Sequence, residues 1–454
     1  MSHDLVVQNG TVVSVEHGTF RADVAADDGV ISAIARPNSL DGDEVVDAAG
    51  KYVLPGAIDP HVHYGLFRDY ELDHETETHG DLVGGVTTVG NIFRRPGKYT
   101  DIMAGYFEQS EANSYHDYFY TLGILSPDHV AEIPDIVDQL GITTFKWYAL
   151  YKFLTRSKFG LDNDLDDAVG DGMIQALAGV DAPTTLGYHA ENTEITQSIL
   201  EPGDPDADYH AFRERYPGYA ETQSMVSAAA LAKLHDYDQH FYTVHISSGG
   251  TADEIAALRH AGYDITGETC PQYLVYTADE CDARMKVTPP MRDASDRETL
   301  WKRLADGTLS CIGTDHVPNT LDEKLGDDLW ETGLAFSGTQ TMLPLILSEG
   351  VNEGRISLER AVAVTSTNTA KAWKLYPKKG TIRMGSDADL AVVDLDETKT
   401  VTADLLQAGS DYSIYEGMEV TGWPTHTIVR GRVVFEEGEV TGEKGYGTHV
   451  DRPV

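Results

Sequence analysis

The chain has 454 residues, of which 41% are hydrophobic and 9% aromatic, enough apolar material for one large barrel and a smaller domain. Its 74 acidic and 34 basic residues give a formal net charge of −40 at pH 7. So negative a chain is repelled by nucleic acid and by anionic membranes, and we therefore exclude both as partners. No run reaches the roughly 18 apolar residues that a membrane span needs.

The cysteines and the first residues indicate a cytoplasmic protein. Cys270, Cys281 and Cys311 are too few for a disulfide framework, and the start MSHDLVVQNG lacks the basic and apolar regions of a signal peptide. Acidic clusters such as LDNDLDDAVGDG and EPGDPDADY predict a solvated acidic surface. Our hypothesis is adaptation to high salt, because the Debye length falls to about 3 Å at 1 M and self-repulsion is then screened.

Both ends of the chain show the alternating pattern of short strands. The pattern is seen in DLVVQNGTVVSVEHGTF, DADLAVVDLD and THTIVRGRVVFEEGEV. We expect residues 1–54 and 380–454 to form one small β-sandwich domain. Turns between its strands are expected at Gly10, Gly18, Gly385 and Gly431.

Between the ends, short β-rich runs alternate with longer helical stretches, which is typical of a parallel βα repeat. We count eight such runs: GAIDPHVH, VTTVGNIF, DYFYTLGIL, ITTFKWYAL, TTLGYHAE, HFYTVHIS, YDITGETCP and LSCIGTDH. Eight strands close a (β/α)₈ TIM barrel, which we place at residues 55–379. Helices are expected at LAKLHDYDQ, TADEIAALRHAG and RETLWKRLADG, where apolar residues recur every three to four positions.

Two connections are longer and more polar than a minimal loop, residues 152–172 and 201–221. Both follow strand candidates directly, so we expect them at the carboxyl face of the barrel, where loops build active sites. They would be substrate covers or subunit contacts.

Candidate metal ligands begin with His61 and His63, at the end of the first strand run. Side chains two apart on a strand point to the same side, so both imidazoles can reach one ion. Alone, such a pair is weak evidence, because chance or packing explains most matches of this kind. The other candidates stand in runs four, five, six and eight: Lys146, His189, His245 and Asp315. Because parallel strands end at one mouth of the barrel, their joint placement predicts a metal centre there.

Two of these residues leave alternatives open. An ammonium has no lone pair for a metal, so Lys146 is either modified or an ion-pairing or snorkelling lysine. Asp315, in TDH, could also belong to a simple turn. Imidazoles and a carboxylate suit Zn²⁺ and, less selectively, Mn²⁺ or Co²⁺. Cys270 is close in the sequence, but packing is its expected role.

The sequence resembles the hydantoinase and dihydropyrimidinase family of cyclic amidohydrolases over nearly its whole length. The matching motifs include GGVTT, TTFKWYALYK, YHAEN, VHISS, GETCPQYL, TDHVP and EGMEVTGWPTHTIVRGRVV. Several short motifs are common to many amidohydrolases, whereas GETCPQYL and the long final motif are more discriminating. The resemblance implies hydrolysis of a hydantoin or dihydropyrimidine ring to an N-carbamoyl amino acid.

The resemblance also implies roles for the candidate ligands. Lys146 would be carboxylated by CO₂ to a carbamate that bridges two divalent cations, with Zn²⁺ as the first expectation. His61, His63 and Asp315 would hold one cation, and His189 and His245 the other. Asp315 would in addition act as general base and then as general acid.

Substrate contacts are implied less clearly. Tyr151 stands at the position of the family's substrate-binding tyrosine and would donate to the oxyanion, unless it is a rim tyrosine. Thr288 replaces the usual serine, where the family uses main-chain atoms, although a plain loop residue is an alternative. Relatives carry a ring-binding asparagine that is missing from ETGLAFSGTQTMLPLIL, where Ser337 or Thr332 could substitute.

Three competing functions remain in view. A dihydroorotase would carry an arginine where this chain has Gly65, to grip the substrate carboxylate, although Arg68 could reach in from the same loop. An allantoinase is a further enzymatic alternative. The alternative from another class is a catalytically silent binding protein on the same scaffold, which the intact ligands argue against. Similar enzymes are homo-oligomers, so we expect a dimer or tetramer.

Overall fold

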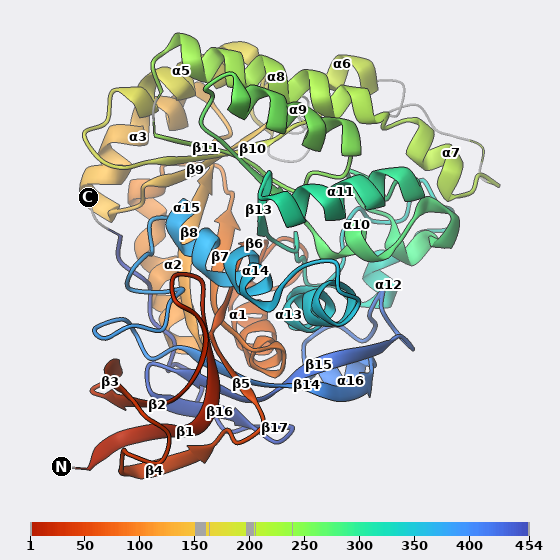
Figure 1. Cartoon of the computed structure of the whole chain (residues 1–454). Helices are drawn as coiled ribbons and strands as arrows, with labels where there is room; N and C mark the ends of the chain where they lie inside the picture. Colours follow the sequence, from red (N-terminus) through yellow and green to blue (C-terminus); the bar gives the residue numbers. More distant parts are fainter. Residues whose placement is uncertain are drawn as a thin grey trace. The chain divides into compact units, whose positions relative to one another are not determined.

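The computed structural model describes residues 2–149, 160–162, 164–196, 204, 206–237 and 239–452. The chain forms two compact units (Figure 1). The first comprises Met1–Gly90, Gln109–Phe119 and Ser337–Val450, and the second Asn91–Glu108, Tyr120–Phe336 and Asp451–Val454. No helix within the described ranges is long and apolar enough to cross a membrane.

Eight parallel strands form the barrel sheet, and they follow one another in chain order from β6 to β13. Their bounds are β6 Ala57–Val62, β7 Val86–Phe93, β8 Asp117–Gly123, β9 Thr144–Tyr148, β10 Thr185–His189, β11 His240–Thr243, β12 Ile265–Thr269 and β13 Leu309–Ile312. Nearly all of their side chains are buried, as expected of a sheet that is covered on both faces. All eight strands predicted from the sequence, and with them the (β/α)₈ fold, are confirmed.

Helices follow the strands of the barrel. They are α1 Tyr70–Asp81, α2 Tyr99–Asn113, α3 Pro127–Leu140, α5 Asp167–Ala178, α6 Thr193–Thr196, α7 Tyr209–Glu214, α8 Gly218–Leu234, α9 Gly249–His260, α10 Pro271–Val275, α11 Ala294–Asp306, α12 Leu321–Lys324, α13 Met342–Leu345, α14 Leu358–Val362 and α15 Asn368–Ala372. In the second unit, α5, α8 and α9 lie side by side along strands β9, β10 and β11 (Figure 1).

The boundaries of α3 show how the sequence specifies such a helix. Ser126 accepts a hydrogen bond from the His129 backbone N–H, and Pro127 occupies the first turn, where no donor is needed. The helix buries Ile133, Ile136 and Val137 on one face. It ends at Gly141, which takes the left-handed conformation with φ 64°.

The strands from the two ends of the chain form a separate nine-stranded sheet in the first unit (Figure 1). Their bounds are β1 His3–Ser14, β2 Gly18–Asp27, β3 Val30–Ala35, β4 Gly42–Asp47, β5 Tyr52–Pro55, β14 Leu390–Thr400, β15 Glu419–Val429, β16 Arg432–Glu436 and β17 Glu439–Val440, with α16 at Ala403–Leu406. The strand β5 pairs antiparallel with β14, which joins the two termini. Side chains such as Val12, Val24, Val53 and Val392 make its core. The predicted β-sandwich domain is confirmed.

One of the four predicted turn glycines has another role. Gly18, Gly385 and Gly431 have the positive φ values expected in turns. Gly10 instead lies inside β1, beside a bulge in the pairing with β2. A Cβ at Gly10 would lie 2.4 Å from a methyl carbon of Val53, so the glycine is required for close packing.

Three other expectations need correction, because helices begin earlier or end sooner than the sequence suggested. The loop predicted over residues 152–172 includes the start of α5, where the Asp166 side chain caps the helix by accepting from Ala168 and Val169. The loop predicted over 201–221 contains α7 and the start of α8. The helix predicted from LAKLHDYDQ is only the last turn of α8, which ends at Leu234.

Candidate active site

The first unit carries His61 and His63, at the carboxyl end of β6. Both imidazoles are buried, with ring centroids 5.2 Å apart. The backbone N–H of His61 donates to Asp59 Oδ1 over 3.1 Å, and the Thr339 hydroxyl donates to Asp59 Oδ2 over 2.8 Å. The strand and the buried Asp59 carboxylate therefore fix the backbone that carries His61 and His63.

The second unit carries Lys146, in β9, with only 1% of its surface exposed. Lys146 lies opposite Gly187 of the neighbouring strand β10. Burial lowers the pKa of Lys146 to about 8, although the charges of Asp315 and Glu268 act in the opposite direction. A minority of the Lys146 side chains is therefore neutral at neutral pH, more than for an exposed lysine, and only the neutral amine can react with CO₂.

His189 and His245 are brought together in the same unit. His189 ends β10 and His245 follows β11, and the Nδ1 atom of His189 lies 2.8 Å from Nε2 of His245. On its other side, Nε2 of His189 lies 2.9 Å from Glu191 Oε2. When Nε2 donates its proton to this carboxylate, Nδ1 keeps its lone pair. Two ring nitrogens thus converge on one point, as ligands of a single cation do.

The Glu191 carboxylate favours a cation at that point. Burial raises the pKa of Glu191 to about 8, and the charge of Arg292 opposes that rise. The ionised form is therefore stable only when positive charge lies nearby. A divalent cation on the far side of the His189 ring would supply that charge, so the residues present fit a bound metal.

Two predicted ligands have an unusual backbone conformation. His245 has φ 39° and Asp315 has φ 56°, a region that non-glycine residues seldom occupy. Glu268 stabilises the first of them, because its carboxylate accepts the His245 N–H over 3.0 Å and the Tyr242 hydroxyl over 2.7 Å. Such conformations cluster at functional sites, where the surrounding fold offsets their cost.

A buried ionic network in the second unit includes Arg292, whose charge acts on Glu191, and sequence reasoning missed it. Arg292 donates from Nε to the Ser247 hydroxyl over 3.0 Å, and its Nη2 lies 3.6 Å from Glu221. Glu221 in turn accepts from Ser247 and from the Ser248 backbone. The motif YHAEN contains no residue of this network, but it did contain the signal for Glu191, since a carboxylate two residues after a ligand histidine is well placed to orient it.

The predicted substrate contacts are placed only in part. Tyr151 lies outside the described residues. Thr288 is buried and precedes Pro289 through a cis peptide bond. The Ser337 hydroxyl lies 2.5 Å from that of Ser410, and the Thr332 hydroxyl donates to the Asp328 carbonyl over 2.9 Å. The last two hydroxyls thus have partners within their own units.

Another group of carboxylates in the first unit has metal-compatible spacing but is already neutralised. Oxygens of Asp117, Asp387 and Asp389 lie within 4.8 Å of one another. The ammonium of Lys379 lies 2.5 to 2.9 Å from all three, and Arg430 also contacts Asp117. Burial alone would lower the pKa of Lys379, but the three carboxylates outweigh it and raise the pKa. This Lys379 cluster is a structural ion network.

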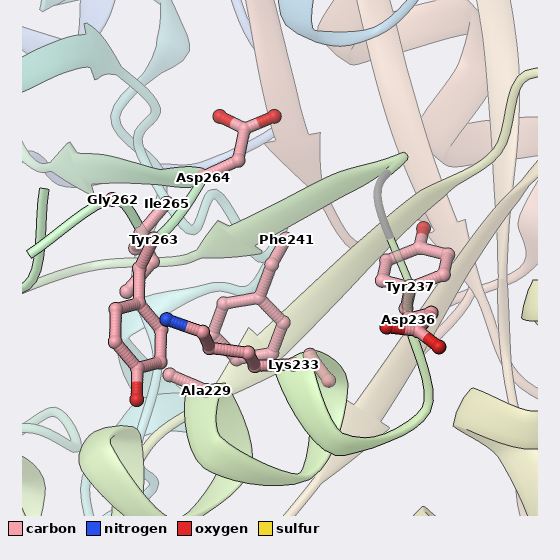
Figure 2. Close-up of a pocket in the computed structure, with 10 residues that line it drawn as sticks. Ala229, Lys233, Asp236, Tyr237, Phe241, Gly262, Tyr263, Asp264 and Ile265 are labelled. Carbon is pink, nitrogen blue, oxygen red and sulfur yellow. The ribbon is translucent and has the colours of Figure 1, made fainter.

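A pocket of about 330 Å³ lies elsewhere in the second unit, at the amino ends of β11 and β12 (Figure 2). Phe241, Tyr237 and Tyr263 line it, and the Lys233 ammonium lies 4.0 Å from the centre of the Tyr263 ring. None of the predicted site residues lines this pocket. Active sites of barrels form at the carboxyl ends of the strands, so the pocket is not the candidate site.

Comparison with known proteins places this geometry in a family. Residues 203–434 match the amidohydrolase family model. An L-hydantoinase of Paenarthrobacter aurescens is 34% identical, covering 99% of this chain and 98% of its own. An allantoinase of Rubrobacter xylanophilus is 32% identical over 96% of this chain and 95% of its own. The solved dihydropyrimidinase of Brevibacillus agri is 29% identical, with a TM-score of 0.90 over 98% of both chains.

The chain therefore belongs to the amidohydrolase family, in its hydantoinase and dihydropyrimidinase group. It is a hydrolase of cyclic amides, as the sequence predicted.

Proposed function

We propose that the protein hydrolyses a hydantoin or dihydropyrimidine ring to an N-carbamoyl amino acid, using two divalent cations. The observation that carries this proposal is the convergence of His189 and His245, backed by Glu191. The relatives named hydantoinase and dihydropyrimidinase supply the class of ring.

The six predicted ligands divide between the two cations as the family resemblance implies. His61, His63 and Asp315 would hold one cation, and His189 with His245 the other. Lys146, carboxylated by CO₂, would bridge them, which turns a buried amine into an anionic oxygen ligand. Imidazole and carboxylate donors suit Zn²⁺ first, with Mn²⁺ or Co²⁺ as substitutes.

When bound, the cations would supply Lewis-acid activation of water at neutral pH. Asp315 takes the proton of the attacking water as a general base and returns it to the ring nitrogen as the C–N bond breaks. Tyr151 donates a hydrogen bond to the carbonyl oxygen as negative charge develops there. The attacked carbonyl carbon becomes a carboxylate, and the released nitrogen becomes the terminal NH2 of the N-carbamoyl group, which stays on the other ring nitrogen.

A second candidate is allantoinase activity, which the 32% identical allantoinase favours. Allantoin contains a hydantoin ring, so the same cleavage applies to it. The missing ring-binding asparagine leaves the substituent preference to experiment. We further propose a cytoplasmic homo-oligomer, either dimer or tetramer, which light scattering of the purified protein would measure.

The test is a substrate panel with the protein reconstituted with Zn²⁺ and bicarbonate at high salt. We expect loss of the ring-amide absorbance for dihydrouracil, substituted hydantoins or allantoin. A purified protein that holds no divalent ion and cleaves none of these rings after reconstitution would instead be a silent binding protein.

A companion variant tests the bridge. Lys146→Ala should lose activity, because alanine has no amine to carry the bridging carbamate, and short carboxylic acids should partly restore it. Full activity of the untreated variant would exclude Lys146 as a metal bridge. The readout is ring cleavage together with bound metal per chain.

A further inference from the structure

Helix α1 presents three buried carboxylates along one face. Asp73, Glu77 and Asp81 are four residues apart, which places them one above another on a helix, and all three are fully buried. Buried carboxylates require hydrogen-bonding or charged partners. We name these three residues the acidic stripe. Each has a partner in the loop that directly follows His63, and Asp81 also lies 3.1 Å from Nε2 of His116.

The two ends of the acidic stripe hold the start of that loop. Asp73 Oδ2 accepts the Gly65 backbone N–H over 2.7 Å, and Asp81 Oδ2 accepts the Tyr64 hydroxyl over 3.1 Å. Gln340 donates to the other oxygen of Asp81 over 3.0 Å. The loop after the predicted metal ligands is therefore fixed by helix α1.

Arg68 is the only charged partner of the stripe among the loop residues 64–68. Its Nε lies 3.5 Å from Asp73 Oδ1 and its Nη1 lies 3.6 Å from Glu77 Oε1. The side chain is only 10% exposed. A guanidinium is the residue of choice for binding a substrate carboxylate, but here two carboxylates already face it.

The segment around Gly409 closes over the same guanidinium. The Gly409 N–H donates to Glu77 Oε1 over 3.0 Å, and a Cβ at this position would lie 2.4 Å from Arg68 Nη1. Thr76 also donates to Glu77 Oε1, over 2.9 Å. Glu77 is thus held in place from two directions, and it keeps Arg68 against the helix.

The charges of this group disfavour an anion. Two carboxylates of the stripe, those of Asp73 and Glu77, face one guanidinium, so the excess charge is negative in a buried, weakly screened environment. The loop begins at the carboxyl end of β6, where barrel enzymes bind their substrates. A ring that carries its own carboxylate would meet this negative charge and find the arginine already paired.

We propose that Glu77 is a specificity-determining residue, which withholds Arg68 from substrate carboxylates and so restricts the enzyme to uncharged rings. This inference rests on the proposed function. Arg68 is then a latent carboxylate-binding residue. Loss of the Glu77 charge frees its Nη1 nitrogen, while Asp73 still faces Nε.

The experiment compares kcat/KM for dihydroorotate, which carries a carboxylate, and for dihydrouracil, which does not. In the metal-reconstituted full chain, Glu77→Gln should raise the ratio of dihydroorotate to dihydrouracil by at least about tenfold, the effect of one hydrogen bond to a charged group. Adding Arg68→Gln to the same chain should remove the gain, because the gain depends on the released guanidinium.

Glu75→Gln is the matched control, because it removes a carboxylate from the exposed side of the same helix, where Glu75 pairs with Lys444 over 2.7 Å. Its ratio should equal that of the wild type. An unchanged ratio in a folded Glu77→Gln protein, or the same gain in the double variant, would overturn the inference. If circular dichroism shows that Glu77→Gln does not fold, the single variant Arg68→Gln tests the inference. A ratio of dihydroorotate to dihydrouracil equal to that of the wild type supports the inference. A lower ratio overturns it, because Arg68 would then already bind the substrate carboxylate in the wild type.

The same measurements distinguish failure of the proposed function from failure of the inference about Glu77. A wild-type protein that cleaves no uncharged ring contradicts the proposed function itself, whereas normal cleavage of dihydrouracil with an unaltered ratio contradicts only the role of Glu77.

Discussion

His189 is held on one side by Glu191, so that its other ring nitrogen is directed at His245. At the scale of single residues, this orientation is what distinguishes a metal ligand from a packed core histidine. The carboxylate decides which nitrogen carries the proton, and the proton decides whether a lone pair is available to a cation.

Glu191→Gln should therefore weaken metal binding. The glutamine amide can donate to Nε2 of His189, which moves the ring proton to Nδ1 and removes the lone pair there. We expect the affinity for Zn²⁺ to fall about 10- to 100-fold, measured by equilibrium dialysis of the metal-free protein. Glu214→Gln, an exposed carboxylate of the same unit, should leave it unchanged. Equal affinity in both variants would assign Glu191 a purely structural role.

Glu191 should also give the metal-free protein a distinctive pH dependence. Burial raises its pKa from 4.5 to about 8, so the folded chain keeps a proton that the unfolded chain loses above about pH 4.5. The stabilising contribution is present below pH 4.5 and is lost as the pH rises to 8. Urea titrations in the presence of a chelator should show the free energy of unfolding of the wild type falling, relative to Glu191→Gln, between about pH 5 and pH 8. Parallel curves would contradict this.

At the scale of secondary-structure elements, the eight barrel strands were predictable because each is a short apolar run that ends in turn or polar residues. The placement of His61, Lys146, His189 and His245 in the barrel strands or just after them followed from the same pattern. The helices α5 and α7 were missed because acidic residues mask their periodicity, although Asp166 and Asp208 are ordinary N-caps.

The residues that support the site were not predictable by the same route. Glu191 is the exception, because it contacts His189 only two residues away. Glu268 and Arg292 act through contacts between strands and loops that are far apart in the sequence. Their neighbours are fixed only when the strands are in register. Gly10 was wrongly predicted to lie in a turn for a related reason. A side chain at this position would overlap Val53, which belongs to a strand much later in the sequence.

The tight contact at Gly10 gives a prediction for the terminal sheet. Gly10→Ala should lower the free energy of unfolding by about 1 to 3 kcal/mol, because the added methyl overlaps Val53. Gly105→Ala is the control, since Gly105 lies in α2, where an added Cβ would have no atom within 4 Å, and alanine favours helices. Chemical denaturation measures both. Equal stability of Gly10→Ala and the wild type would show that the bulge can adjust.

At the scale of the whole molecule, the charge of −40 dominates the response to solvent. Self-repulsion of exposed carboxylates should destabilise the fold when salt is removed, because the Debye length grows from about 3 Å at 1 M to about 30 Å at 0.01 M. We expect Tm to fall when NaCl is lowered from molar to tens of millimolar, measured by calorimetry. A Tm that is independent of salt would remove the hypothesis of adaptation to high salt.

The stability that the Lys379 cluster contributes depends on salt differently from that of the acidic surface. Its ammonium and its three carboxylates are all buried, so dissolved ions cannot come between them. Raising the salt concentration therefore relaxes the outside of the protein while the charges inside keep their full attraction. A salt titration therefore distinguishes the contribution of the exposed carboxylates from that of the buried Lys379 cluster. A Lys379→Met variant should lose stability by the same amount at every salt concentration, whereas neutralising surface carboxylates should matter only when salt is scarce.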